Sequence, residues 1–497
     1  MTLGTRRPVG INVARVGLAL AVAFSGIAAG AGYWQVFEAS RLSNAPDNPI
    51  VVAAARNAVR GRILDRDGRV LAGNRRDQNG EPYRIYPDTS VAPVVGYASR
   101  QFGSSGLERA YDAQLVGLSR GDPVGDLLQK FDRDRYHPQE LRLSLSLRLQ
   151  RAAVRALGSD RGAVVMLDPR SGEVLALAST PVFDASAIAD PATSTAAFDA
   201  LRDDPRQPLL PRATQGRYVP GSIFKIVTGL AALASGAITP ETTFRQQPRA
   251  EREGLFVSGF RIRDGHHLMT GSHALNLLEA TEVSCNIYYA LAGIRTGGEA
   301  LADYAGRLGF GGAIPFDLAT ARSQVTNGGG SFGGGFLDDV ELANASYGQA
   351  ETLVTPLQMA LVAATVANDG VLMRPRLVTA MTSPETGTRE IGAQELRRVV
   401  EVDVARTMRE GMTRAVEGDL GRLFTAGAKV PGILTAGKSG TAELGGSGEP
   451  HSWFIGFAPA DNPAVAIAVL VERGGRGGER AAPLAGRMLE LALGGGG

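Results

Sequence analysis

The first side chains that could do chemistry in this 497-residue chain are in Ser222-Ile223-Phe224-Lys225, where a hydroxyl and an amine are three residues apart. Residues at i and i+3 share a helix face. Pro220-Gly221 and the apolar run 226–234 predict a buried helix that carries both groups. Lys225 can activate Ser222 as a nucleophile only as a neutral amine. Lowering the lysine pKa from ~10.4 to about 7 requires burial, a second cation and a helix N-terminus acting together.

A second cluster, Ser284-Cys285-Asn286, lies between predicted helical stretches at 275–282 and 287–294. Ser284 could relay a proton, and Asn286 could hold both Lys225 and a substrate amide. A tripeptide of this kind also suits a helix cap, and the sequence leaves that interpretation open.

A third cluster, Lys438-Ser439-Gly440-Thr441, lies on a predicted strand late in the chain. Lys438 would be the second cation that keeps the first lysine neutral, and Ser439 and Thr441 could bind a substrate carboxylate. Gly440 would let a substrate approach the strand edge and pair with it as an added strand.

Residues 432–439 also match the Walker A pattern of nucleotide-binding proteins. In such a loop a helix must follow, with its N-terminus facing the phosphates. Here a strand and a glycine-rich loop are predicted to follow, which disfavours nucleotide binding.

Composition indicates a globular chain with more than one domain, because 44% of its residues are hydrophobic and its net charge is only +2. Lysine and arginine are scattered, which gives no indication of nucleic-acid binding. The single cysteine, Cys285, excludes an intrachain disulfide and a multi-cysteine zinc site. His266, His267 and His273 lack carboxylates at ligand spacing, and we therefore expect no metal and no cofactor.

Near the N-terminus, residues 16–34 form an uncharged apolar run of the length that crosses a bilayer. Arginines precede it, which predicts a cytoplasmic tail at 1–15, a membrane anchor at 16–36 and a polar linker at 37–58. A cleaved signal peptide is the alternative, although the apolar segment is long for one.

Strand patterns then predict two modules. Residues 59–145 form a small β-rich module, in which Gly106–Asp112 is interpreted as an ionic staple. Residues 146–497 begin with a helix at 149–157 and a hairpin of strands, continue through helices that include 355–367, and end with three strands and a helix. Strands early and late predict one antiparallel sheet built from both ends of the module, an α+β arrangement. The later strands are expected at 434–443, 451–458 and 464–472, and the last helix at 484–493.

The order Ser-x-x-Lys, Ser-x-Asn, Lys-Ser-Gly is similar to the pattern of penicillin-binding proteins and serine β-lactamases. The chain as a whole resembles a class B penicillin-binding protein, in particular the short penicillin-binding protein A type. The resemblance covers nearly the whole chain. Besides the three clusters, it rests on Arg60–Arg66, Gly106-Leu107-Glu108, Gly162–Asp168, Tyr347-Gly348-Gln349, Thr355–Ala360 and Trp453–Pro459.

The resemblance implies a transpeptidase domain with a five-stranded antiparallel sheet and a helical subdomain, on a pedestal that resembles the family's dimerisation domain. It implies that Ser222 attacks the D-Ala-D-Ala bond of a peptidoglycan stem peptide while Lys225 accepts its proton. Ser284, Asn286 and Lys438 assist, and the backbone N–H groups of Ser222 and Thr441 form the oxyanion hole. An amine of a second stem then completes the cross-link, and β-lactams acylate the same serine.

The resemblance also implies a location and a partner. The catalytic domain would lie outside the bacterial cytoplasmic membrane on a single-pass anchor, and the pedestal would contact a polytopic glycosyltransferase. Two alternatives remain: a carboxypeptidase or β-lactamase in which water replaces the amine, and a non-catalytic scaffold that activates the glycosyltransferase. The Glu-x-x-Leu-Asn segment of class A β-lactamases is missing after Ser284, and the intact clusters argue against a degenerate scaffold.

Overall fold

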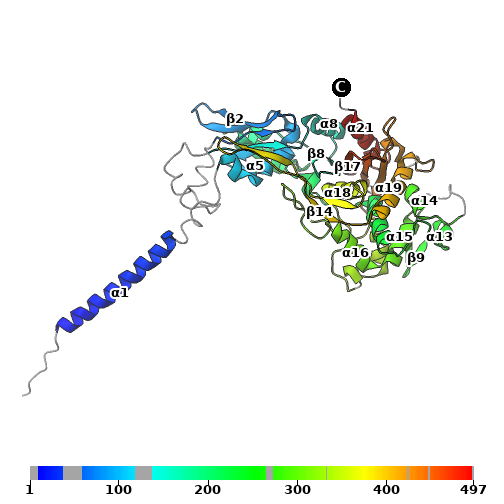
Figure 1. The fold of residues 1–497 in the computed structure, drawn as a ribbon, viewed down its shortest axis with the longest axis horizontal. Coiled ribbons are helices and arrows are strands. Elements are labelled where there is room, and N and C mark those ends of the chain that lie inside the picture. The colour runs from blue at the N-terminus through cyan, green and yellow to red at the C-terminus, as the bar shows by residue number, and fades with distance from the viewer. Residues whose placement is uncertain are drawn as a thin grey trace, which may run out of the picture.

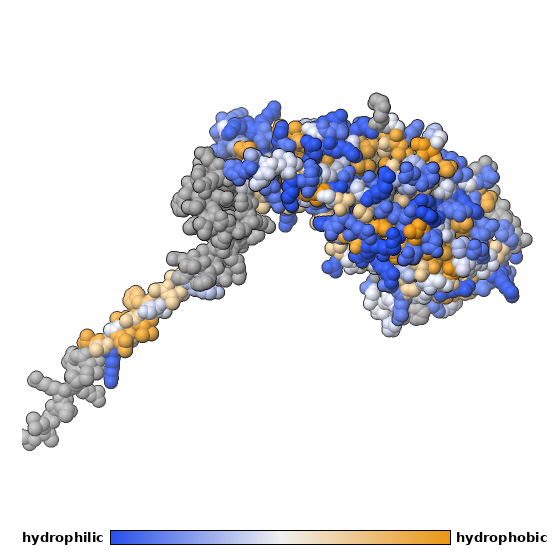
Figure 2. Space-filling view, in the orientation of Figure 1, coloured by the Kyte–Doolittle hydropathy of each residue, from blue (hydrophilic) through white to orange (hydrophobic). Residues whose placement is uncertain are grey.

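The computed structural model describes residues 9–36, 59–117, 137–264, 273–331, 333–421, 425–445 and 448–494. The predicted linker, His266 and His267 lie outside these residues. Helix α1 (Val9–Val36) begins earlier than the predicted anchor. Its segment Val13–Ala31 has a mean hydropathy of 1.8 and is long and apolar enough to cross a membrane. Figure 2 shows α1 as a mainly apolar rod.

The centre of the larger module is a five-stranded sheet in the order β15-β16-β17-β7-β8, antiparallel throughout. The sheet combines the early hairpin with the three late strands, which confirms the predicted antiparallel α+β arrangement. β15 is an edge strand. The bounds are β7 Gly162–Leu167, β8 Val174–Thr180, β15 Ala436–Ala442, β16 His451–Ala458 and β17 Val465–Val471.

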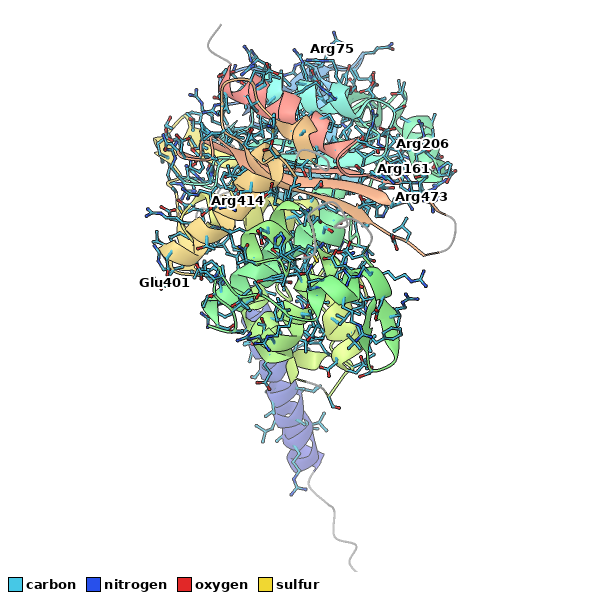
Figure 3. The ribbon with its side chains drawn as sticks, turned by 90° about the vertical axis from the view of Figure 1, so that its right-hand side faces the viewer. Arg75, Arg161, Arg206, Glu401, Arg414 and Arg473 are labelled. Carbon is cyan, nitrogen blue, oxygen red and sulfur yellow. The ribbon has the colours of Figure 1, made fainter. Side chains whose placement is uncertain are left out.

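Both faces of this sheet are buried because helices cover each of them. Successive residues of a strand point to opposite faces. In β7, Val165 packs in the core beneath α18 (Pro356–Ala367), whereas Val164 packs in a separate core with α8 (Leu147–Leu157) and α21 (Ala481–Leu493). Figure 3 shows α21 on one side of the sheet and the green helices from the middle of the chain on the other.

The smaller module has a six-stranded sheet in the order β13-β12-β6-β1-β2-β3. Four of its strands come from the predicted pedestal: β1 Ile63–Leu64, β2 Val70–Arg76, β3 Pro82–Ile85 and β6 Glu140–Leu143. The other two, β12 (Val378–Ser383) and β13 (Gly387–Glu390), come from the far half of the chain. Figure 1 shows this yellow segment lying beside the blue and cyan strands, where β12 pairs with β6 at the edge of the pedestal strands. Strand patterns in the sequence do not predict this pairing of β12 with β6, because they carry no information about distant partners.

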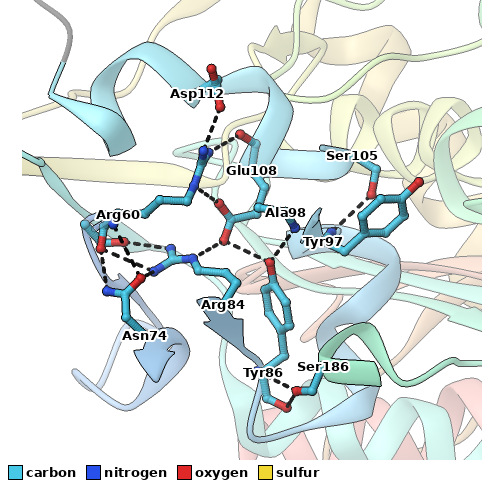
Figure 4. A network of polar contacts seen from close by, with 11 residues as sticks. Arg60, Asn74, Arg84, Tyr86, Tyr97, Ala98, Ser105, Glu108, Asp112 and Ser186 are labelled. Atoms are coloured by element: carbon cyan, nitrogen blue, oxygen red, sulfur yellow. Dashed lines mark hydrogen bonds and ion pairs between the residues drawn. The ribbon is translucent and has the colours of Figure 1, made fainter. Parts of the chain in front are cut away.

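A buried ionic cluster holds the beginning of the smaller module (Figure 4). Glu108 is fully buried and accepts hydrogen bonds from Arg60 Nε at 2.8 Å and from Arg84 Nε at 2.7 Å. Tyr86 Oη donates to the same carboxylate at 3.2 Å, and Arg60 Nη1 reaches Asp112 at 2.8 Å. The expected ionic staple is therefore confirmed.

The remaining elements connect and cover the two sheets. In the smaller module they are η1 Thr89–Val91, α4 Ala92–Val95, β4 Ala98–Ser99, β5 Gly103–Ser104, α5 Gly106–Ala110 and α6 Asp112–Val116. In the larger module they are α9 Ala185–Ala189, α10 Ser194–Asp203, α11 Arg212–Gln215, η3 Gly221–Phe224, α12 Lys225–Ala234, α13 Gln247–Glu253, β9 Leu255–Val257, β10 Phe260–Ile262, α14 Leu277–Glu282, α15 Asn286–Thr296, α16 Gly298–Arg307, η5 Gly333–Gly335, α17 Asp339–Ala345, β11 Val371–Met373, β14 Glu395–Arg398, α19 Val402–Glu417 and η6 Ala426–Ala428.

Candidate active site

Ser222 lies on a 3₁₀ turn, η3, that leads directly into α12. The sequence predicted a single helix, and the structure divides it: Ser222 is half-buried on the turn, and Lys225 is fully buried as the first residue of α12. Gly221 has a φ of +58°, a backbone conformation that residues with a Cβ rarely adopt. Its N–H donates to Gly348 O at 2.9 Å. The glycine before the nucleophile therefore serves the turn geometry.

The 3₁₀ turn that carries Ser222 packs directly against strand β15. A Cβ added at Gly440 would lie 2.9 Å from Pro220 O, and one added at Gly221 would lie 2.8 Å from Thr441 O. The absence of a side chain at Gly440 therefore lets the turn itself approach the strand, in addition to the predicted approach of substrate. This contact brings the backbone of Ser222 and Thr441 close together.

Two lysine amines converge on Ser284. Lys225 Nζ donates to Ser284 O at 2.5 Å, to Ser284 Oγ at 3.2 Å and to Asn286 Oδ1 at 2.7 Å. Lys438 Nζ donates to Ser284 Oγ at 2.8 Å and to the backbone O of Ser439 at 3.1 Å. The structure thus brings together Lys225, Ser284, Asn286 and Lys438, which come from three distant parts of the chain.

Burial lowers the pKa of Lys225 to about 8, against an opposing effect of the Asp264 carboxylate. Burial, followed by the like charge of Lys225, lowers the pKa of Lys438. Two ammonium groups that share one hydroxyl in a buried site repel each other, and desolvation disfavours both charges. The pair therefore favours a state with a neutral amine near neutral pH, as a proton acceptor for a serine requires.

The tripeptide at 284–286 serves as both a cap and a polar site. Cys285 is the N-cap of α15, and its Sγ accepts from Tyr288 N at 3.1 Å. Ser284 has φ +65, which is uncommon for a residue with a side chain, and it presents both its carbonyl and its hydroxyl to Lys225. Both interpretations of this cluster therefore apply, to different residues.

A cleft of about 840 Å³ opens beside Ser222. Ser222, Asn286 and Thr441 line it. Ser439 does not, because it is buried with its Oγ 3.2 Å from Thr425 Oγ1. Lys438 and Ser439 lie inside β15, followed by further strand, and the nucleotide-loop alternative is wrong for this reason.

Sequence reasoning missed several residues of this cleft and its surroundings. Asp264 is buried and accepts the backbone N–H of Asn286, and Arg263 and Glu443 line the cleft. Tyr347 and Gln349 also line it; they were noted as part of a motif but given no role. None of these side chains has a spacing pattern that marks it, because folding alone brings them to the cleft.

A second buried ionic cluster lies behind the nucleophile turn. Glu472 accepts from Tyr218 Oη at 2.8 Å and from Arg212 Nε at 2.7 Å, and it also pairs with Arg161. Trp453 Nε1 donates to Val219 O at 3.0 Å. These contacts hold the segment that leads to Ser222 against the end of the sheet. In Figure 3, Arg161 is labelled near this end of the strands.

Within the described residues, no group of three or more potential metal ligands occurs. His273 lies 3.3 Å from Glu279 Oε1. His266 and His267 are outside the described residues, and the expectation of no metal at these histidines stays a prediction.

Two family models match the chain. The penicillin binding protein transpeptidase domain matches residues 162–490, and the penicillin binding protein A dimerisation domain matches residues 60–134. Among curated proteins, the peptidoglycan D,D-transpeptidase PbpA of Mycolicibacterium smegmatis is 35% identical over 97% of this chain and 99% of its own length. The PbpA of Mycobacterium tuberculosis is 35% identical over 92% of this chain and 94% of its own length.

Solved structures agree with these matches. Penicillin-binding protein A from M. tuberculosis, in its penicillin G acyl-enzyme complex, has a TM-score of 0.77 and 34% identity, and the match covers 88% of this chain and 100% of that one. The imipenem acyl-enzyme complex of the same protein has a TM-score of 0.77 and 34% identity over 88% and 99% of the two chains. With the matched domains, these likenesses show that the chain belongs to the class B penicillin-binding proteins and is a peptidoglycan D,D-transpeptidase, a penicillin-binding serine acyltransferase of cell wall synthesis.

Proposed function

We propose that Ser222 is the nucleophile of this transpeptidase and that Lys225 is its base. The observation that carries the proposal is the convergence of two buried amines on Ser284. One of these amines belongs to Lys225, which lies one turn after Ser222, and Ser222 lines the cleft. Ser284 and Asn286 hold the Lys225 amine, and Lys438 places a second buried amine on the same Ser284 hydroxyl.

In the acylation step, Ser222 Oγ bonds to the carbonyl carbon of the D-Ala-D-Ala peptide link. Lys225 Nζ accepts the hydroxyl proton, and Ser284 lies between the two lysines as a relay. The C–N bond breaks, its nitrogen takes up the proton, and the terminal D-alanine leaves. The backbone N–H groups of Ser222 and Thr441 stabilise the oxyanion, and each such donor is typically worth ~10² to 10³ in rate. Gly440 and Thr441 form the strand edge beside the substrate, and Ser439 supports that edge from its buried position.

In the second step, an amine of a neighbouring stem peptide attacks the acyl-serine ester. A proton from this amine passes through Lys225 to Ser222 Oγ as the ester C–O bond breaks, and the cross-linked amide is released. The serine and the base return to their starting protonation states.

We further propose that α1 anchors the chain in the cytoplasmic membrane, with residues 1–15 inside and 37–58 as a linker. The pedestal at 59–145 and the transpeptidase domain at 146–497 would lie on the outer side. We also propose that the β-rich pedestal contacts a polytopic glycosyltransferase, and the match to the penicillin binding protein A dimerisation domain is what supports this. Protease digestion of whole and permeabilised cells tests the orientation: cleavage of the larger module only after permeabilisation of the cytoplasmic membrane would contradict it.

Intact mass measurement after brief exposure to benzylpenicillin tests the catalytic assignment. The full-length chain in detergent should gain one covalent adduct, and Ser222→Ala should gain none while remaining folded. Ser235→Ala is a matched control, because this exposed serine caps the other end of α12, and it should gain the adduct normally. A lasting adduct favours a transpeptidase over a β-lactamase. An adduct that survives in Ser222→Ala would refute the assignment.

A further inference from the structure

Glu443 lies in the active-site cleft at a place that the reaction does not yet explain. It follows the last residue of β15 and lines the cleft together with Ser222 and Thr441. Its side chain is exposed, and it forms no ion pair with any residue that the structure describes. The carboxylate is therefore available to a ligand in the cleft.

Two of the other cleft carboxylates are already engaged by the protein, and a third, the exposed Glu351, lies in a loop rather than at the end of β15. Asp338 caps α17 by accepting from Val340 N at 2.8 Å and Glu341 N at 2.9 Å. Glu341 accepts from Thr326 Oγ1 at 2.7 Å and from Leu337 N at 2.6 Å. These two acids maintain the cleft wall, in contrast to Glu443.

Positively charged side chains also line the cleft. They are Arg261 and Arg263, on and just after β10. Arg261 Nε donates to Glu253 O at 2.7 Å, and its guanidinium lies 5.7 Å from the ring centre of Phe256. A cleft lined by both cationic and anionic side chains suits a peptide that carries both charges, because complementary charges set the orientation of a ligand.

The position of Glu443 also follows the course of an added strand. β15 is an edge strand, and a peptide that pairs with it beside Thr441 runs past its end. An extended chain rises about 3.3 Å per residue, which places a substrate residue next to the acylated one within reach of Glu443. A transpeptidase must in addition bind an amine as its second substrate.

We propose that Glu443 is a specificity residue that binds an ammonium group of the peptide substrates. The ammonium group belongs either to a side chain of the donor stem or to the acceptor stem. The inference rests on the proposed role of Ser222, since that role defines the reacting end of the cleft.

Two assays on the full-length chain in detergent separate these sources. In the donor assay, D-alanine release is measured from two D-Ala-D-Ala peptides that differ only in a free or acetylated side-chain amine. In the acceptor assay, an amine-free thioester acylates the enzyme, and the ratio of aminolysis to hydrolysis is measured with a D-amino acid amide.

In one of the two assays, the unaltered chain should prefer the charged amine about two- to fivefold, and Glu443→Gln should lose this preference. This is the range expected for a solvent-accessible ion pair. Glu443→Lys should favour the acetylated donor or suppress aminolysis further. Glu449→Gln makes the same charge change in an exposed residue outside the cleft lining and should match the unaltered chain. Thermal midpoints of all variants check that they are folded.

Unchanged selectivity of Glu443→Gln and Glu443→Lys in both assays would overturn the proposal. An equal effect of Glu449→Gln would also overturn it, because the effect would then be one of overall charge. Failure of the Ser222 assignment is a separate result, since the benzylpenicillin adduct on Ser222 does not depend on an ammonium site.

Discussion

Buried cations in the two modules are treated in opposite ways. In the smaller module, Arg60 and Arg84 each bond to the buried carboxylate of Glu108. In the larger one, the hydrogen bonds of Lys225 and Lys438 within the described residues run to neutral oxygens. The first arrangement neutralises each cation by direct pairing with a carboxylate. The second leaves two amines beside each other without a directly paired carboxylate among the described residues.

The pKa directions reflect this difference. Burial alone lowers the pKa of Arg60, but Glu108 and Asp112 together raise it above its usual value. Burial lowers the pKa of Lys225 to about 8, and only Asp264 and Cys285 oppose it. A directly paired cation stays charged and holds the structure together, whereas an unpaired one is ready to give or take a proton.

The largest effect should come from removing the unpaired base. Lys225→Gln should lower the rate of acylation by benzylpenicillin ~10²- to 10⁴-fold, the usual contribution of a positioned acid or base. The thermal midpoint should fall only slightly, because no ion pair is lost and a glutamine amide can still donate to Ser284 or Asn286. Lys429→Gln, which removes a half-exposed lysine paired with Glu417, should acylate normally. Acylation of Lys225→Gln within tenfold of the normal rate would contradict the role of this residue.

In the paired cluster around Glu108, the same kind of substitution should lower stability and leave the rate of acylation unchanged. Glu108→Gln strands two buried arginines and should lower the free energy of unfolding of the smaller module by about 3 to 5 kcal/mol. Urea unfolding of the full-length chain measures it. Glu140→Gln breaks an ion pair with the exposed Arg62 and should cost less than about 1 kcal/mol. Equal losses for the two variants would remove the contrast between the clusters.

The pH dependence of acylation should follow the Lys225 amine. Its folded pKa of about 8 lies below the ordinary value of 10.5, so the amine becomes protonated as pH falls through 8. The acylation rate should drop about tenfold per pH unit below that point and level off above it. The same burial costs stability below pH 8, and this cost is relieved as pH rises from 8 toward 10.5. A flat rate between pH 6 and 8 would exclude Lys225 as the base.

The smallest effect concerns the cluster behind the nucleophile turn, which resembles the paired type. Tyr218→Phe removes one hydrogen bond to Glu472, and we expect a loss of about 1.5 to 3 kcal/mol in stability. Because Arg212 and Arg161 still pair with this carboxylate, the acylation rate should change little. Tyr83→Phe on β3 is a control with the same chemical change outside this cluster. A large drop in acylation would instead give Tyr218 a positioning role.

The sequence by itself was enough to select the proposed reacting groups. Ser222 and Lys225 are three residues apart, and Ser284 and Asn286 lie at the start of a helix. Both features depend only on neighbouring residues. The strands at 162–168 and 451–458 and the helix at 355–367 were also predictable, because alternation and apolar runs are local signals. The stapling role of Glu108 followed from its surrounding charges.

The tertiary structure alone decided how these groups meet. It divided the predicted helix at Lys225, turned Ser284 toward both lysines, brought Arg263 and Glu443 into one cleft, and added β12 to the edge of the distant pedestal strands. All four outcomes depend on pairing between residues far apart in the chain. Local propensity carries no information on such contacts, because they are set by which buried surfaces and hydrogen bonds fit together once the chain has folded.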